Sequence, residues 1–170
     1  MINLKPFQQE DFDRLIRWID NPELLITIAG NVWSYPLTIA HLQHYLDDAK
    51  SYAFNIVETP QDIVVGHAEI ILANDGTGKI DKLFVDPSRR GKGFCPKVIN
   101  RLLTYAFDKL PVHTVELNVF DWNTAGIRCY ERSGFSFRPE MKQLFPLGEK
   151  TWTALNMSIS KERFLSMESK

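Results

Sequence analysis

Apolar residues recur along the chain with two different spacings, and each spacing predicts a different kind of element. A spacing of three and four residues is typical of amphipathic helices, and it occurs over residues 9–20, 39–49 and 98–110. Short runs rich in β-branched and aromatic residues, bounded by turn residues, predict strands. These runs span residues 2–7, 52–58, 63–72, 79–85, 112–120, 135–139 and 151–159. The chain is therefore predicted to combine several strands with a smaller number of helices.

Side chains at the segment boundaries support this division. Thr38 and Asn123 are good helix N-caps, and Asn123 opens a further, short helix. Asn21-Pro22 is expected to break the first helix, which leaves residues 24–36 apolar and irregular. The residues after Lys161 are polar, and we expect them to be mobile or weakly helical.

The predicted element order is β-α-α-β-β-β-α-β-α-β-β, which combines antiparallel hairpins with one crossover helix. This order predicts an α/β (α+β) fold with a mixed sheet and helices on both faces. A chain of 170 residues has the length of one ordinary domain. We therefore expect a single domain over residues 1–160 and a polar C-terminal tail over residues 161–170.

Composition narrows the classes of protein that fit. The apolar fraction of 44% is sufficient for a core, and the 24% of charged residues argues against disorder. The net charge of −1 argues against general electrostatic binding to nucleic acid or to an anionic membrane surface. No run approaches 18 consecutive apolar residues, and the N-terminus lacks the regions of a signal peptide. A cytoplasmic protein that contacts no membrane is expected.

The cysteines and histidines indicate neither a disulfide framework nor a metal site. Cys95 and Cys129 are too few for such a framework, and we expect both to be buried thiols in a reducing compartment. The four histidines are scattered, and no Cys/His cluster has the spacing of metal ligands. No bound metal is expected.

The segment 86–95, Asp-Pro-Ser-Arg-Arg-Gly-Lys-Gly-Phe-Cys, lies between a predicted strand and a predicted helix. Gly91 and Gly93 allow backbone N–H groups to approach an anion, while Arg90 and Lys92 add positive charge. The dipole of the following helix acts at the same place. A solvated basic turn would show the same residues, so the loop alone leaves both interpretations open. The glycine spacing excludes a P-loop and a dinucleotide fingerprint.

Two motifs carry a resemblance to a known family. Residues 90–95 match Arg/Gln-x-x-Gly-x-Gly/Ala and resemble the pyrophosphate loop of the GNAT acetyltransferases, although Cys95 stands where the family usually has Gly or Ala. Residues 123–135 resemble the family's second motif, Asn-x-x-Ala/Gly-x-x-x-Tyr-x-x-x-Gly-Phe. Taken alone, the second motif also fits a capped helix whose Tyr130 packs in the core. The two motifs in this order identify the chain as a member of the GNAT family, most clearly over residues 63–137.

The resemblance implies the GNAT acyl-CoA N-acyltransferase fold, whose mostly antiparallel central sheet is splayed at the cofactor site, and it implies acetyl-CoA as cosubstrate. Backbone groups of the strand before the loop would bind pantetheine and the acetyl carbonyl; these residues are Leu83, Phe84 and Val85. Backbone amides of the loop would bind the pyrophosphate; these residues are Arg90, Gly91, Lys92, Gly93, Phe94 and Cys95. Asn123 would contact the CoA arm.

Acetyl transfer to an amine needs a neutral amine, a donor for the oxyanion and a proton for the leaving thiolate. Tyr130 aligns with the family's tyrosine, and a phenol with a pKa of about 10 stays protonated at neutral pH, so Tyr130 is the candidate general acid. The general base is open. Lys79 stands where some members carry Glu, and the first candidates are Glu69 and Asp81, with a water relay as an equal alternative.

The predicted function is transfer of acetyl from acetyl-CoA to a primary amine, either a small molecule or a protein N-terminus, by direct attack in a ternary complex. Residues 18–23 and 33–38 resemble the branch that contains ribosomal-protein N-terminal acetyltransferases, and residues 31–35 are the predicted wall of the acceptor site. Two alternatives are a non-catalytic acyl-CoA-binding or regulatory module and an aminoglycoside-type acetyltransferase. No nucleic-acid partner is expected, and a homodimer is left open.

Overall fold

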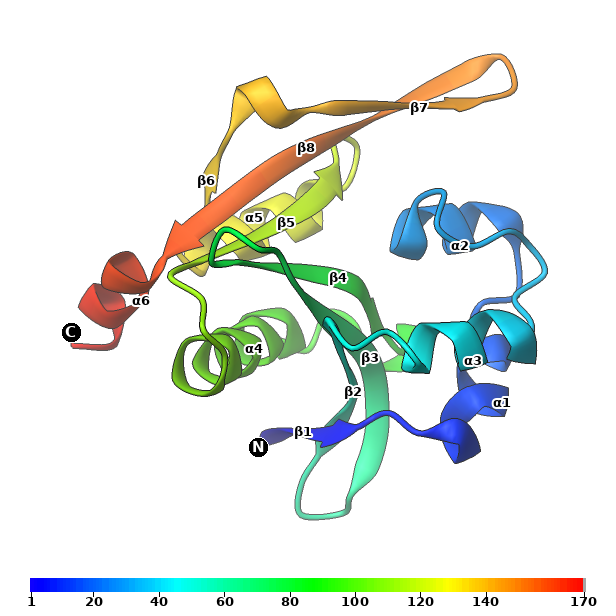
Figure 1. The fold of residues 1–170 in the computed structure, drawn as a ribbon, viewed down its shortest axis with the longest axis horizontal. Coiled ribbons are helices and arrows are strands. Elements are labelled where there is room, and N and C mark those ends of the chain that lie inside the picture. Colours follow the sequence, from blue (N-terminus) through cyan, green and yellow to red (C-terminus); the bar gives the residue numbers. More distant parts are fainter. Residues whose placement is uncertain (170) are drawn as a thin grey trace. The chain divides into compact units, whose positions relative to one another are not determined.

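The computed structural model describes residues 1–169, which form two compact units along the chain traced in Figure 1. The first unit contains Met1–Ile71 and Asp81–Lys92. The second unit contains Leu72–Ile80 and the chain from Gly93 onward. The backbone therefore passes from one unit to the other three times: after Ile71, after Ile80 and, within the basic loop, after Lys92.

The first unit is built on the strands β1 (Ile2–Pro6), β2 (Ser51–Glu58), β3 (Ile63–Leu72) and the second half of β4 (Thr77–Val85). β1 pairs with β2 and β2 pairs with β3, both antiparallel, and a bulge interrupts the second ladder at Ile56 and Val57. β4 follows β3 in the order of hydrogen-bonded strands. These strands lie within two residues of the predicted ones.

Three α-helices complete the first unit. They are α1 (Phe12–Trp18), which follows the 3-10 turn η1 (Gln9–Asp11), α2 (Pro22–Ala29) and α3 (Ile39–Leu46). Their apolar faces meet in one core, and burying each large side chain there contributes about 1.5–3 kcal/mol. Its most buried members are Phe12, Leu15, Ile19, Leu25, Leu42 and Phe84.

Helix α2 corrects the prediction that residues 24–36 are irregular. The Asn21 side chain accepts a hydrogen bond from the N–H of Leu24 at 2.9 Å, and Pro22 occupies the first turn. Asn followed by Pro can end one helix, but the same pair is also a favourable N-cap and first residue of the next helix. Only the packing of Leu25, Ile28 and Ala29 into the core decides between these two outcomes.

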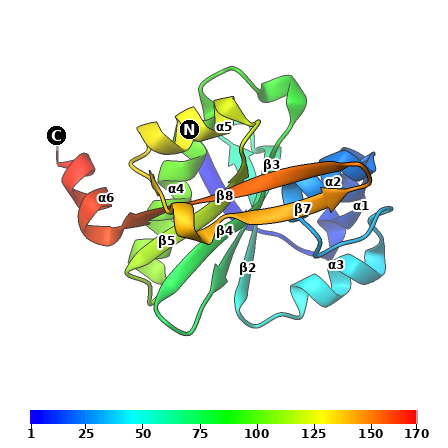
Figure 2. The ribbon, with the colours of Figure 1, turned by 90° about the horizontal axis from the view of Figure 1, so that it is seen from above.

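The second unit contains the first half of β4 and the strands β5 (Thr114–Phe120), β6 (Ser136–Phe137), β7 (Gln143–Leu147) and β8 (Lys150–Ser160). Residues Thr77–Ile80 of β4 run parallel to β5, and β5 runs antiparallel to β8. β6 and β7 pair antiparallel with different parts of β8, and Figure 2 shows the long β7–β8 hairpin. With one parallel pair among antiparallel ones, the prediction of a mixed, mostly antiparallel sheet is confirmed.

The predicted strand over residues 135–139 is wrong in extent, since β6 has two residues and the prediction missed β7. β7 contains Pro146 and has mostly exposed side chains. A prediction from sequence that relies on runs of apolar, β-forming residues does not detect a strand with these features. The pairing of Gln143–Leu147 with residues Lys150–Ala154 creates this strand.

The helices of the second unit are α4 (Phe94–Lys109), α5 (Thr124–Arg132) and α6 (Lys161–Glu168). The predicted inner face of α4 is confirmed, because Val98, Ile99, Leu102, Leu103 and Ala106 are all buried. Ser160 caps α6, whose Phe164 packs on Phe107 with ring centroids 5.5 Å apart. Residues 161–168 thus form a docked helix, which corrects the prediction that the residues after Lys161 are mobile or weakly helical. No helix within residues 1–169 has the length and apolar character of a membrane span.

Candidate functional site

The basic loop leaves β4 through a short capped turn. The Asp86 side chain accepts a hydrogen bond from the N–H of Ser88 at 2.9 Å and begins the 3-10 turn η2 (Pro87–Arg89). The Arg90 side chain then folds back, donating from Nε to the Val85 carbonyl at 3.0 Å, with its guanidinium 5.5 Å from the centre of the Phe84 ring. These contacts fix the path of the loop at the end of β4, within the first unit.

Two glycines set the backbone of the loop. Gly91 and Gly93 have φ angles of +73° and +70°, which only glycine adopts without strain. A Cβ atom built at either position meets no protein atom within 4 Å, so the conformation, and not crowding, requires glycine. Gly93 is the N-cap of the 16-residue helix α4, whose first two residues are Phe94 and Cys95. The first-turn N–H groups and the helix dipole make this end of α4 suitable for an anion.

The end of β4 contains a strained residue. Lys82 has a φ angle of +48°, a left-handed conformation that is uncommon for a lysine. It precedes the three residues predicted to bind pantetheine, of which Phe84 is buried whereas Leu83 and Val85 are partly exposed. The register of β4 with β5 covers Thr77–Ile80, and β4 itself continues to Val85.

The structure brings the two candidate bases, Glu69 and Asp81, into one cluster through Lys82. The Lys82 Nζ atom lies 2.5 Å from Glu69 Oε2 and 3.5 Å from Asp81 Oδ2. The Ser51 hydroxyl donates to the other Glu69 oxygen. Glu69 and Lys82 are only 2% and 3% exposed, whereas the Asp81 side chain is 19% exposed. Lys82 was not among the predicted site residues, although it directly follows Asp81 in a predicted strand.

Burial governs the electrostatics of this cluster. Desolvation raises the pKa of Glu69, and the nearby Lys82 ammonium opposes that rise. The ammonium also lies 5.2 Å from the centre of the Trp33 ring and 5.1 Å from that of Tyr45. Two aromatic faces and a carboxylate thus compensate the buried positive charge of Lys82.

The segment predicted to form a wall of the acceptor site, residues 31–35, contains a buried tryptophan, Trp33. Its side chain is 7% exposed and packs edge-on against Tyr45, with ring centroids 5.2 Å apart. Its neighbours Val32 and Tyr35 are 66% and 44% exposed. The indole belongs to the core of the first unit and also lies over the Lys82 ammonium, a contact between residues far apart in the sequence.

His67 is a second buried titratable group in the first unit. Its Nε2 atom lies 3.0 Å from the Tyr45 hydroxyl, and its ring meets the Phe7 ring edge-on with centroids 4.5 Å apart. Burial, helped by the charge of Lys82, lowers the pKa of His67 to about 3. His67 is therefore neutral at physiological pH.

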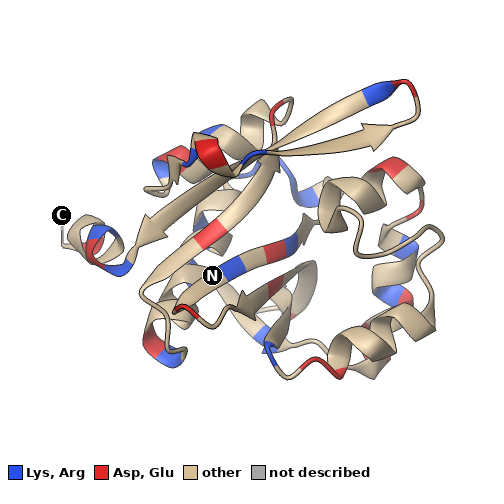
Figure 3. Ribbon diagram, turned by 45° about the horizontal axis from the view of Figure 1, so that its top comes forward, with Lys and Arg blue, Asp and Glu red and all other residues tan. Residues whose placement is uncertain are grey.

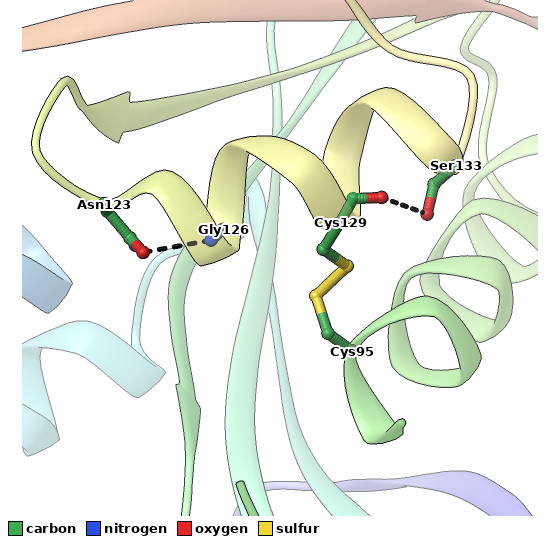
Figure 4. Close-up of a disulfide and its surroundings, with 5 residues drawn as sticks. All are labelled: Cys95, Asn123, Gly126, Cys129 and Ser133. Carbon is green, nitrogen blue, oxygen red and sulfur yellow. Dashed lines mark hydrogen bonds between the residues drawn. A yellow bond between two sulfur atoms is a disulfide. The ribbon is translucent and has the colours of Figure 1, made fainter. Parts of the chain in front are cut away.

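Tyr130 lies on α5, in the second unit, and Asn123 is the N-cap of the same helix. Asn123 accepts a hydrogen bond from the Gly126 N–H at 3.0 Å, which confirms the predicted N-cap (Figure 4). The Tyr130 ring packs near Phe135, with centroids 6.2 Å apart. Burial raises the pKa of Tyr130 to about 12, so its phenol carries a proton at neutral pH. That protonation state is the one a general acid requires.

Cys95 and Cys129 form a disulfide, which corrects the prediction of two buried thiols (Figure 4). Their Cα atoms are 6.3 Å apart although 34 residues separate them in the sequence. The bond forms because α4 packs against α5 and places the two cysteines opposite each other. The prediction of two thiols was based on the number of cysteines, and that number does not indicate how close the two residues lie in the folded chain.

The charges are unevenly distributed along the chain. Residues 1–71 contain ten Asp and Glu against four Lys and Arg. Figure 3 marks the acidic and basic residues on the ribbon. Among residues 1–169, no group of three or more His, Cys, Asp and Glu is placed to hold a metal ion.

Comparison with known proteins adds a family match. The sequence model of the acetyltransferase (GNAT) family matches residues 6–135. Spermidine N(1)-acetyltransferase from Vibrio cholerae is 28% identical over 112 residues, which is 65% of each protein. Spermine/spermidine N(1)-acetyltransferase from Bacillus subtilis is 31% identical over 62 residues, which is 36% of this chain and 41% of the relative. The chain thus spans less than two thirds of either curated relative.

Among solved structures, the chain resembles spermidine N-acetyltransferase from Vibrio cholerae in complex with CoA and spermine. The TM-score is 0.83 at 20% sequence identity, and the match covers 96% of this chain and 98% of that one. At this identity the likeness establishes the fold.

Proposed function

The chain belongs to the acetyltransferase (GNAT) family, and we propose that it transfers the acetyl group of acetyl-CoA to a primary amine by direct attack in a ternary complex. The predicted family and fold, and with them acetyl-CoA as the family's cosubstrate, are confirmed by the match and the structural likeness. The acceptor and the residues that act on it are proposals.

One observation carries the cofactor assignment. Gly93 caps a 16-residue helix in a left-handed conformation and follows a basic, glycine-containing loop. We assign the pyrophosphate to the backbone amides of Arg90, Gly91, Lys92, Gly93, Phe94 and Cys95. Leu83, Phe84 and Val85 would supply backbone groups to pantetheine and to the acetyl carbonyl, and Asn123 would contact the CoA arm.

The proposed chemistry begins with a neutral amine. Its nitrogen attacks the thioester carbonyl and a C–N bond forms. The nitrogen then gives one proton to water, from which the acid is later reprotonated, and the C–S bond breaks when the tetrahedral intermediate collapses. Tyr130 would protonate the departing CoA thiolate, a role that fits a phenol held in its neutral form. The amide product keeps the acetyl group, and CoA leaves as a thiol.

The acceptor must first lose a proton, which costs about 4–5 kcal/mol for an alkylamine at neutral pH. Of the two candidate bases, Asp81 is the more exposed, whereas Glu69 is enclosed by Lys82 and Ser51. We therefore propose that Asp81, directly or through a water molecule, receives this proton. Glu69 would then act by holding Lys82 beside it.

A polycationic amine is the acceptor class that we favour. The two curated relatives described above are named for acetylation of spermidine or spermine. The excess of acidic residues over residues 1–71 suits a substrate with several positive charges. Aminoglycosides share this charge and remain an alternative, and a protein N-terminus of the ribosomal-protein type remains a prediction.

The decisive experiment measures CoA thiol release with acetyl-CoA and a panel of acceptors: spermidine, spermine, an aminoglycoside and N-terminal peptides. Mass spectrometry of the product checks for a gain of one acetyl group. We expect turnover with polyamines. Saturable acetyl-CoA binding by calorimetry with no acetylated product from any amine would instead indicate the non-catalytic acyl-CoA-binding module. The absence of acetyl-CoA binding would contradict the proposed function.

A further inference from the structure

The disulfide joins the two sequence motifs of the proposed site. Cys95 is the last residue of the basic loop motif and lies in the first turn of α4. Cys129 lies on α5, directly before Tyr130. Both cysteines belong to the second unit, and so do Gly93 and Asn123. The bond therefore links the helix end assigned to the pyrophosphate with the helix that carries the proposed acid.

We propose that Cys95 and Cys129 form a thiol–disulfide exchange site, at which low-molecular-weight dithiols set the affinity of the protein for acetyl-CoA. The inference rests on the proposed function, since it assigns a modification to the same cofactor loop. Cys95 is partly exposed, whereas Cys129 is 9% exposed, so an incoming thiol reaches Cys95 more readily.

The exchange proceeds in two balanced steps. A thiolate of the dithiol attacks the Cys95 Sγ atom and forms a mixed disulfide with it. The bond to Cys129 breaks at the same time. The Cys129 sulfur leaves as a thiolate, which then takes up a proton. The second thiol of the reagent, after losing its proton, then attacks the reagent's own sulfur in the mixed disulfide. Cys95 is released and protonated, and the reagent closes into a cyclic disulfide. Two electrons pass from the dithiol to the protein, and a disulfide oxidant reverses the reaction.

The bond affects affinity through the freedom of the anion-binding amides. In the oxidised protein the first turn of α4 is covalently held against α5. Reduction leaves only the packing of the two helices to hold it. The loop amides then have more freedom in the unbound protein, and more of it must be lost when they close on the pyrophosphate. The oxidised form should therefore bind acetyl-CoA more tightly, by about 5- to 150-fold, the usual range of coupling between two sites.

The test compares two states of the wild-type protein. Calorimetry measures the acetyl-CoA dissociation constant of the oxidised protein and of the same protein reduced with a phosphine, which contributes no competing thiol. Alkylation followed by intact mass spectrometry counts the free thiols in each sample. A Cys129→Ser variant breaks the bond and leaves the loop residue Cys95 in place. We expect it to bind as weakly as the reduced wild type, with or without phosphine.

Each outcome gives a separate answer. Two free thiols in the air-oxidised protein, or equal or tighter binding after reduction, would overturn the inference while leaving the proposed function intact. Absence of acetyl-CoA binding in both states would contradict the proposed function itself and remove the inference with it. If Cys129→Ser does not fold, the two states of the wild type still decide the question.

Discussion

Lys82 is a single residue that holds several parts of the first unit together. Its ammonium contacts Glu69 and Asp81 and lies over the rings of Trp33 and Tyr45. It also has a left-handed backbone directly before the proposed pantetheine-binding residues. A buried charge of this kind is stable only when its partners stay in place.

Replacing Lys82 with Met should therefore leave Glu69 buried without a counter-charge. We expect the Lys82→Met variant to lose about 3–5 kcal/mol of unfolding free energy at pH 7, measured by urea denaturation. The double variant Lys82→Met/Glu69→Gln should recover much of that loss. Lys5→Met is the matched control, because its ion pair with Asp62 is exposed and should contribute about 0–1 kcal/mol. Equal losses of unfolding free energy in Lys82→Met and Lys5→Met would show that the buried pair of Lys82 and Glu69 contributes no more than an exposed one.

His67 predicts a pH dependence of stability. Its pKa falls from an ordinary value of 6.5 to about 3 in the folded protein, so the unfolded chain binds a proton that the folded protein excludes. This contribution of His67 to the unfolding free energy is fully present above pH 6.5 and is lost progressively as the pH falls towards 3. At 1.36 kcal/mol per unit, the loss at pH 5 is about 2 kcal/mol. Urea unfolding at pH 7 and pH 5 should show this loss in the wild type and a smaller one in His67→Gln.

Tyr130 should be required for turnover but not for cofactor binding. We expect Tyr130→Phe to lower kcat by at least about tenfold, because it removes the proposed proton donor. The acetyl-CoA dissociation constant should stay unchanged by calorimetry. Tyr105→Phe, in the middle of α4, serves as the control for loss of a hydroxyl. A decrease in kcat of less than tenfold with binding intact would exclude Tyr130 as the acid.

At the scale of elements, α4 and α5 are held together both by packing and by the disulfide. The helix ends assigned to the cofactor depend on this pair, since Gly93 caps one helix and Asn123 caps the other.

Reduction of the disulfide should destabilise the folded protein. A bond that closes a loop of 34 residues contributes about 2–4 kcal/mol, mainly by restricting the unfolded chain. For a chain of this size, the melting temperature should fall by roughly 5–15 °C. Scanning calorimetry with and without phosphine measures the change. Cys129→Ser should melt at the lower temperature in both conditions. If the melting temperature of the wild type is the same with and without phosphine, the disulfide does not make this contribution to stability.

At the scale of the whole molecule, the chain passes three times between the two units, and two of these passages lie in or next to segments assigned to acetyl-CoA. One lies within β4 and the other within the basic loop. A homodimer remains a prediction, which light scattering on the purified protein can test.

The two units should unfold together, as expected for a single domain over residues 1–160. Splitting them would break the continuous strand β4, whose residues belong to both units. We expect one calorimetric transition with equal calorimetric and van't Hoff enthalpies. Acetyl-CoA should raise its midpoint without splitting it. Two separate transitions would show that the units are independent domains.

The sequence alone determined those parts of the protein that depend on short-range patterns. The inner face of α4 follows from its helical spacing, and the caps Thr38 and Asn123 follow from side chains that bond three residues ahead. The motifs at residues 90–95 and 123–135 identified the family, because each is contiguous in the chain.

Tertiary structure alone decided the features that join distant residues. The Cys95–Cys129 bond, the burial of Trp33 over Lys82 and the contact of Lys82 with Glu69 each depend on how separate elements pack. Strand β7 exists because β8 pairs with it. A local pattern records the preference of a segment for helix or strand, whereas these contacts arise only when the packed core brings separate segments within bonding distance.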